Sequence, residues 1–164
     1  MSSTSARLAP ENLIGQSSTS RADALAAYAA PALRLTLAAV MFPHGAQKAL
    51  GWFGGYGWTG TMGFLTGTAH LPSPVAAGVI LLEFLGPVLL ALGLFTRWVA
   101  LGFIGLMAGA IATVHAPNGF FMNWGGTQAG EGFEYHLLVI GIGAALVLLG
   151  GGPLSLDRRR AATR

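Results

Sequence analysis

The chain has 164 residues, of which 53 % are hydrophobic and only 9 % are charged, whereas a soluble domain carries about 25 % charged residues. So few charges cannot cover the surface of a soluble protein of this size, so the composition predicts an all-α integral membrane protein. The chain contains no cysteine, which excludes a disulfide, a thiolate nucleophile and an iron–sulfur cluster held by this chain alone. The formal net charge of +3 does not indicate nucleic-acid binding, because the basic residues flank apolar segments without interleaved aromatic residues.

The first 26 residues differ in composition from the rest of the chain. They are rich in Ser, Ala and Thr, and we expect residues 1–26 to form a flexible cytoplasmic tail because they cannot bury enough apolar surface. Their apolar runs are too short for the hydrophobic region of a signal peptide. The first spanning helix is therefore expected to direct the chain to the membrane.

Four apolar segments follow this tail and predict four transmembrane helices. At 1.5 Å per residue, each segment is long enough, or nearly so, to cross a hydrocarbon core of about 30 Å. Three glycines and a proline at 150–153 end the last helix. The sequence predicts an integral membrane four-helix bundle over residues 27–153, with a basic cytoplasmic tail at 154–164 and helices at about 28–50, 73–95, 98–115 and 134–151.

The basic residues predict the orientation of the bundle. Seven of the nine lysines and arginines lie in the N-terminal tail, the connection between the second and third helices, and the C-terminal tail. Four spans put these three regions on one side, which the positive-inside rule assigns to the cytoplasm. Both termini are therefore expected to be cytoplasmic. The seven residues are Arg7, Arg21, Arg97, Arg158, Arg159, Arg160 and Arg164.

Aromatic residues indicate where the bundle contacts the membrane interface, and small residues indicate where its helices pack together. The outer connections, 51–72 and 116–133, are rich in Trp, Tyr and Phe, which is typical of an interfacial belt; a lid over a pocket is the alternative. Gly105 with Gly109 and Gly141 with Ala145 form small-xxx-small pairs. We expect them to pack inside the bundle, with a homodimer contact as the weaker alternative.

The ionisable residues within the spans are the candidates for chemistry. On the first helix, Arg34, His44 and Lys48 form one polar stripe in ideal helix geometry. Glu83 lies near the midplane, and either Arg34 or His44 is its expected partner. Two interpretations remain open: an ion pair that fixes helix register, or a protonatable group in a proton or quinol path.

A second group of polar residues lies at the outer ends of the last two helices. His115 ends the third helix, and Glu134 and His136 begin the fourth, pointing about 200° apart. We expect Glu134 to face inward with Lys48 as its counter-charge. The sequence has no H-x-x-x-H or E-x-x-H pair, so a metal site is not predicted and haem is disfavoured. A catalytic triad and nucleotide-binding fingerprints are also missing.

Five segments together resemble the DoxX family of small bacterial membrane proteins, over about residues 28–160. The resemblance implies a four-helix membrane domain in the bacterial plasma (inner) membrane. Some relatives are associated with quinone-linked oxidoreductases and others with complexes that respond to thiol or oxidative stress. The segments are LRLTLAAVMFPHGAQKALGWFGG at 33–55, ILLEFLGPVLLALGLFTR at 80–97, HAPNGFF at 115–121, GEGFEYHLL at 130–138 and GGGPLSLD at 150–157.

Three functions are therefore weighed from the sequence. The first is the membrane subunit of a redox system that binds a quinone and works with a redox partner protein, since Arg, His and Glu suit hydrogen bonding and proton transfer. The others are a non-enzymatic scaffold for a partner and a small-solute or proton transporter. No self-contained catalytic motif is found, and no catalytic residue is assigned. The candidate cofactor-binding residues are Arg34, His44, Lys48, Glu83, His115 and Glu134.

Overall fold

The computed structural model describes residues 23–163 and contains, within them, helices and connections but no strand. Three short irregular turns accompany the α-helices: 3-10 turns at Trp52–Gly54 and Ala116–Asn118, and a π-helical turn at Ile111–His115. The α-helices are α2 (Ala29–Leu50), α3 (Gly57–Gly67), α4 (Ser73–Leu92), α5 (Thr96–Ala110), α6 (Glu134–Leu149) and α7 (Leu156–Ala162).

The helices in the described part of the chain have the lengths and composition of a multi-pass membrane protein. Three of its helical segments, Asp23–Leu50, Ser73–Leu92 and Thr96–Asn118, are long and apolar enough to cross a bilayer. The fourth, Glu134–Leu149, is apolar but shorter, at 16 residues. The chain is therefore an all-α membrane bundle, as the composition predicts.

The N-terminal boundary of the first helix differs from the prediction. Residues 1–22 of the expected flexible tail lie outside the described residues. Residues 23–27 are helical and lead directly into α2. The segment Asp23–Ala27 contains three alanines and a leucine, which are among the strongest helix formers. This local helix propensity explains why the helix begins before the expected boundary.

The turn between α4 and α5 is tighter than expected. The helix expected over 73–95 ends at Leu92, because Gly93 adopts a left-handed conformation with φ of 66° that ends a helix readily. The next helix begins at Thr96, two residues before the expected start at 98. The last span ends at Leu149, where Gly150 has φ of 72°.

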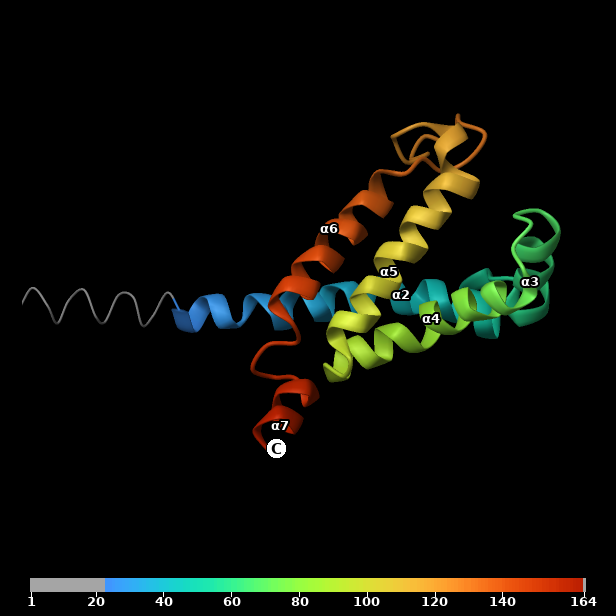
Figure 1. The fold of residues 1–164 in the computed structure, drawn as a ribbon. Coiled ribbons are helices and arrows are strands. Elements are labelled where there is room, and N and C mark those ends of the chain that lie inside the picture. Colours follow the sequence, from blue (N-terminus) through green and yellow to red (C-terminus); the bar gives the residue numbers. More distant parts are fainter. Residues whose placement is uncertain (1–22, 164) are drawn as a thin grey trace, which may run out of the picture.

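The four long helices form two antiparallel pairs. α2 lies along α4, and α5 lies along α6, and the two pairs diverge toward one end of the molecule (Figure 1). At the opposite end, Gly152 lies against Ala30 and Pro31, so the start of α2 and the end of α6 meet. We call this the basic end, because the arginines beside the α4–α5 turn and in α7 lie there. The aromatic end carries α3 and the connection between α5 and α6.

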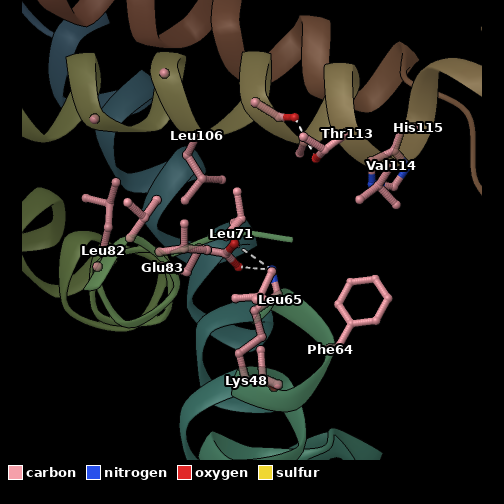
Figure 2. A pocket seen from close by; sticks show the side chains of 18 residues that line it. Lys48, Phe64, Leu65, Leu71, Leu82, Glu83, Leu106, Thr113, Val114 and His115 are labelled. Carbon is pink, nitrogen blue, oxygen red and sulfur yellow. Dashed lines mark hydrogen bonds and ion pairs between the residues drawn. The ribbon is translucent and has the colours of Figure 1, made fainter. Parts of the chain in front are cut away.

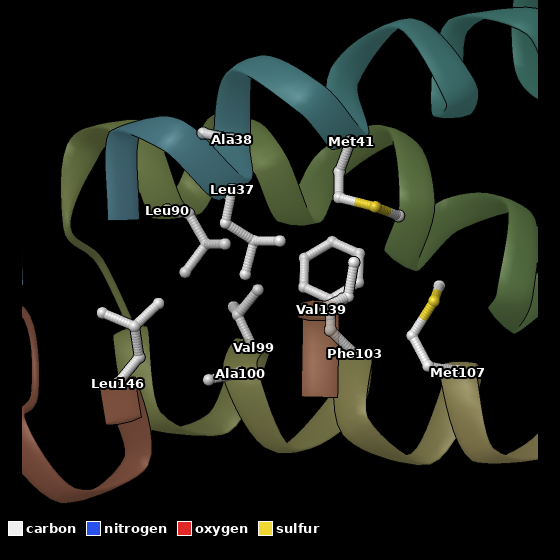
Figure 3. Packing of buried hydrophobic residues seen from close by; sticks show 10 residues of the cluster. All are labelled: Leu37, Ala38, Met41, Leu90, Val99, Ala100, Phe103, Met107, Val139 and Leu146. Carbon is white, nitrogen blue, oxygen red and sulfur yellow. The ribbon is translucent and has the colours of Figure 1, made fainter. Parts of the chain in front are cut away.

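The hydrophobic core joins the two pairs in the half nearer the basic end (Figure 3). Phe103 of α5 is fully buried among side chains from the other three long helices. Removing this apolar surface from solvent is worth about 25 cal/mol per Å². The core side chains are Leu37, Ala38, Met41, Leu90, Val99, Ala100, Phe103, Met107, Val139 and Leu146.

The connection over residues 51–72 contains a helix that the sequence reasoning missed. α3 lies against both α2 and α4, while Trp52, Phe53, Tyr56 and Phe64 in this connection are exposed. Four glycines in Gly57–Gly67 resemble a loop composition, since glycine disfavours helix by about 1 kcal/mol per residue. Contacts with its neighbours, and not propensity, hold this helix.

Candidate functional site

α2 and α4 approach each other closely beside Glu83. Pro87 has no N–H and leaves the Glu83 carbonyl, four residues earlier, without its helical donor. Gly45 lies against that carbonyl, and a Cβ at this position would overlap it. Because Gly45 has no side chain, α2 comes close enough to bring Lys48, about one turn further along, onto the Glu83 carboxylate.

Lys48 and Glu83 form an ion pair in which the lysine Nζ donates to both carboxylate oxygens. Glu83 is only 2 % exposed, whereas the Lys48 side chain is 36 % exposed. The expectation that Glu83 pairs with Arg34 or His44 is therefore wrong. Depth counting places residues along a helix axis, but the approach permitted by Gly45 decides which side chain meets the carboxylate.

An apolar groove extends from this ion pair between α5 on one side and α3 and α4 on the other (Figure 2). Its volume is about 580 Å³, and it lies where the two helix pairs diverge. Figure 2 shows Glu83 and Lys48 bordering this space, with Leu106 of α5 facing them and His115 in the π-helical turn that follows α5. The groove combines a long apolar wall with one buried charge pair.

A smaller and more polar cavity, which we call the polar chamber, adjoins the groove. Its volume is about 200 Å³, and it lies between α2, the end of α5 and the start of α6. The groove and the chamber are contiguous, because five residues line both. These shared residues are Lys48, Glu83, Leu106, Ala110 and His115.

Two adjacent histidines, whose rings are tilted by 47° to one another, form one wall of the chamber. The rings of His115 and His136 have centroids 4.1 Å apart. The His115 Nδ1 lies 2.8 Å from the Glu131 carbonyl oxygen, and it must donate because a carbonyl oxygen only accepts. The Nε2 of a neutral His115 is then an acceptor. The π-helical turn Ile111–His115, a type of distortion frequent at functional sites, carries this histidine.

His136 is a residue that the sequence reasoning set aside. It is 6 % exposed, and its buried Nδ1 has no hydrogen-bond partner among residues 23–163. A buried polar atom of this kind costs free energy. The signal was available: His136, Val139, Gly143 and Leu146 are buried in α6, and their spacing of three, four and three residues marks one helix face.

Tyr135 also belongs to the chamber. Its hydroxyl donates to the Met41 sulfur at 3.2 Å, and its ring lies 5.8 Å from that of His44. His44 lines the chamber with Lys48 and Glu83. Tyr135 and His136 are neighbours in the chain and point about 100° apart on a helix, so no simple apolar periodicity would have found both. Both nevertheless line the chamber.

Glu134 does not face Lys48, so that expectation is wrong. Its Oε1 accepts a hydrogen bond of 2.9 Å from the Met122 backbone N–H. Glu131 acts similarly, with Oε2 accepting from the Asn123 N–H at 2.6 Å. Both carboxylates fold the connection between α5 and α6 back onto the start of α6. The carboxylate of Glu134 is bound by a backbone N–H of this connection and therefore does not contact α2.

Arg34 lies at the basic end and not at the chamber. It is 2 % exposed, and its Nη2 donates to the Leu154 carbonyl at 3.2 Å. Its Nη1 occupies space that a Cβ on Gly93 would need. Of the six candidate residues, the structure brings together His44, Lys48, Glu83 and His115, and it leaves Arg34 and Glu134 outside.

The small-residue pairs are not packed inside the bundle as expected. A Cβ on Gly105, Gly109 or Gly141 would meet nothing within 4 Å in the described structure. Gly105 and Gly109 line the groove, and Gly78 faces it from α4 with the same open space. The glycines widen the groove instead of closing it, because α5 diverges from α4 at this level.

The His, Asp and Glu side chains among residues 23–163 are too dispersed to form a metal site. Within that range, no three His, Cys, Asp or Glu side chains are grouped so that they could hold a metal ion.

Fold and site together define a class of protein: a multi-pass helical membrane protein with an apolar groove that ends at a buried ion pair. The DoxX family model matches residues 29–116, more than half of the chain. The chain belongs to the DoxX family. The match covers α2 to α5 and ends beside His115. Comparisons with curated proteins and with solved structures find no match.

Proposed function

We propose that this DoxX-family protein is the membrane subunit of a quinone-linked redox system, with a quinone in the groove and the polar chamber. One observation carries the proposal: an apolar groove of about 580 Å³ continues into a chamber lined by a buried ion pair and by histidines. Pockets for small molecules span about 300–1,000 Å³, are mostly apolar and contain a few placed polar groups.

The chemistry of the lining residues fits a quinone. The apolar wall and its open glycines suit an isoprenoid tail, whereas the Lys48 ammonium suits a quinone carbonyl as a donor. The His115 Nε2, an acceptor in the neutral ring, suits a quinol hydroxyl. When bound, a quinone would supply two-electron, two-proton chemistry, exchanging its electrons with a redox-active partner protein. The cysteine-free chain would bind, orient and exchange protons.

The same proposal places the basic end in the cytoplasm of a bacterium and the chamber near the outer face of its inner membrane. The positive-inside rule supports this orientation. The absence of cysteine makes a direct test simple. A single cysteine at Thr163 should react with a membrane-impermeant maleimide only after cell lysis, and a single cysteine at exposed Trp124 should react in intact cells. The opposite labelling would overturn the orientation.

The quinone is tested by extraction. Protein purified in mild detergent from quinone-containing membranes should retain an extractable quinone, identified by chromatography and mass spectrometry. His115→Asn should lower the retained quinone at least about tenfold, the effect of losing about 1.4 kcal/mol. His70→Asn is the matched control, since His70 is exposed and lies outside both cavities. Unmodified protein that retains no quinone and binds none when it is added would refute the proposal.

The groove is tested separately from the chamber. Gly105→Leu with Gly109→Leu fills the apolar wall, whereas Gly141→Leu adds the same side chain at an open position outside it. The groove variant should weaken binding of a long-tailed quinone and spare that of a tailless analogue. Equal binding of the long-tailed quinone by both variants would exclude the groove as its site.

A scaffold that anchors a partner protein is the second candidate, and the Lys48–Glu83 contact favours it. An ion pair between α2 and α4 can fix helix register without any chemistry. Under this alternative, a partner protein co-purifies with the chain, and no quinone does. A variant with Lys48→Met and Glu83→Leu would then keep the partner, because two apolar side chains can replace the pair.

A further inference from the structure

Four exposed arginines gather at the basic end, outside the site described above. Arg97 lies in the first turn of α5, and Arg158, Arg159 and Arg160 occupy successive positions of α7. All four are exposed. We call these four residues the basic collar.

Asp157 connects α7, which carries three of the collar arginines, to the α4–α5 turn. Its two carboxylate oxygens accept from the Phe95 and Thr96 N–H groups, each at 2.8 Å. Its own N–H donates to the Gly93 carbonyl at 2.9 Å. The side chain of Ser155 caps α7 by accepting from the Arg158 N–H. Asp157 is therefore committed to backbone donors, and it does not form a salt bridge with the collar.

Two collar arginines are held over neighbouring segments. The Arg97 Nη2 donates to the Leu148 carbonyl at 3.3 Å, at the end of α6. The Arg160 guanidinium lies 5.9 Å from the centre of the Phe95 ring, within the range of a cation–π contact. These contacts leave further guanidinium N–H donors of each arginine for a ligand.

Apolar side chains accompany the collar on the outside of the bundle. Phe95 is 53 % exposed, Trp98 74 %, Leu148 77 % and Leu154 60 %. In a membrane protein, such side chains face acyl chains, and an exposed tryptophan near a helix end is typical of headgroup depth. We therefore expect the arginines to lie at the level of lipid phosphates.

We propose that the basic collar is a binding site for anionic phospholipids, in which arginines hold the phosphate and the exposed rings and leucines contact the acyl chains. Charge complementarity supports this occupant, since the collar carries four positive charges and the adjoining Asp157 carboxylate is engaged with the backbone. Guanidinium groups bind phosphate through paired, charge-assisted hydrogen bonds. The apolar flank distinguishes a lipid from free phosphate.

Lipid binding to the full-length protein in mild detergent tests the collar. Native mass spectrometry would measure retention of phosphatidylglycerol and phosphatidylcholine, and of inorganic phosphate alone. The test variant carries Arg158→Gln, Arg159→Gln and Arg160→Gln. The control variant carries lysine at the same three positions and keeps the charge. Arg, Lys and Gln have similar helix propensities, so α7 should persist in both.

We expect phosphatidylglycerol to bind at least about tenfold more tightly than phosphatidylcholine. Each basic residue near an anionic lipid surface is worth about 1 kcal/mol, so the glutamine variant should lose on the order of 100-fold in phosphatidylglycerol affinity. The lysine variant should lose less than about tenfold. Equal affinity for the two lipids, or an unchanged glutamine variant, would overturn the proposal. Binding of inorganic phosphate as tight as that of the lipid would also overturn it.

Discussion

Removing Lys48 from the Lys48–Glu83 ion pair should lower the free energy of unfolding more than removing Glu83. Lys48→Met leaves the Glu83 carboxylate without its cation at a position that is 2 % exposed. Glu83→Leu instead leaves an ammonium whose side chain is 36 % exposed and can turn toward the open groove. The asymmetry follows from burial, since an unpaired charge costs most where solvent cannot reach it.

The magnitudes follow from the same burial. Removing one partner of a buried pair costs about 3–5 kcal/mol, and the partial exposure of Lys48 puts Lys48→Met near the low end, at about 3 kcal/mol. Glu83→Leu should cost about 1 kcal/mol, because its lysine stays partly hydrated. The double variant should lie within about 1 kcal/mol of the unmodified protein, since apolar side chains can replace a buried pair. The coupling energy is then about 4 kcal/mol.

Reversible unfolding of purified, quinone-depleted protein in mixed micelles, titrated with sodium dodecyl sulfate, measures these free energies. The four proteins of the double-mutant cycle need only be compared with one another. Additive single effects would refute the pair as a stabilising contact. A larger loss for Glu83→Leu than for Lys48→Met would refute the burial argument.

Two further predictions use the same unfolding measurement. Gly45→Ala should lower the free energy of unfolding by about 3 kcal/mol, because the added methyl group would overlap the Glu83 carbonyl. Gly78→Ala is the control: it has open space around it and should be neutral or stabilise by up to about 1 kcal/mol. Equal effects of the two substitutions would contradict the packing argument. Asp157→Ala should cost about 2 kcal/mol by removing two backbone hydrogen bonds at the start of α5. It should also speed tryptic cleavage in α7, and unchanged proteolysis would show that α7 does not depend on this cap.

Element positions were largely predictable from the sequence because they depend on local composition. The span over Ser73–Leu92 has a mean hydropathy of 2.3, and little besides a membrane helix fits such a segment. Glycines mark its end and the end of α6. α3 was not predictable in this way, because its glycines resemble a loop and its helix is stabilised by contacts with α2 and α4.

The partners of charged residues were much less predictable. Glu83 was expected to pair with Arg34 or His44 on the basis of depth, yet it meets Lys48. A lysine reaches several ångströms beyond its Cα, so depth along the axis constrains its charged atom weakly. The rotation and closeness of two helices decide the contact, and here Gly45, which has no side chain, permits the close approach.

Apolar length and sparse charge were enough to predict a four-helix membrane bundle, because they leave few other solutions, and five short segments indicated the DoxX family. The sequence also identified His44, Lys48, Glu83 and His115 as unusual residues for a membrane interior. The packing of the helices, and not the sequence pattern, shows that these four share one space, that Arg34 belongs to the opposite end and that the glycines of α5 line an open groove. Hydropathy acts on each segment separately, whereas a site depends on how helices approach one another.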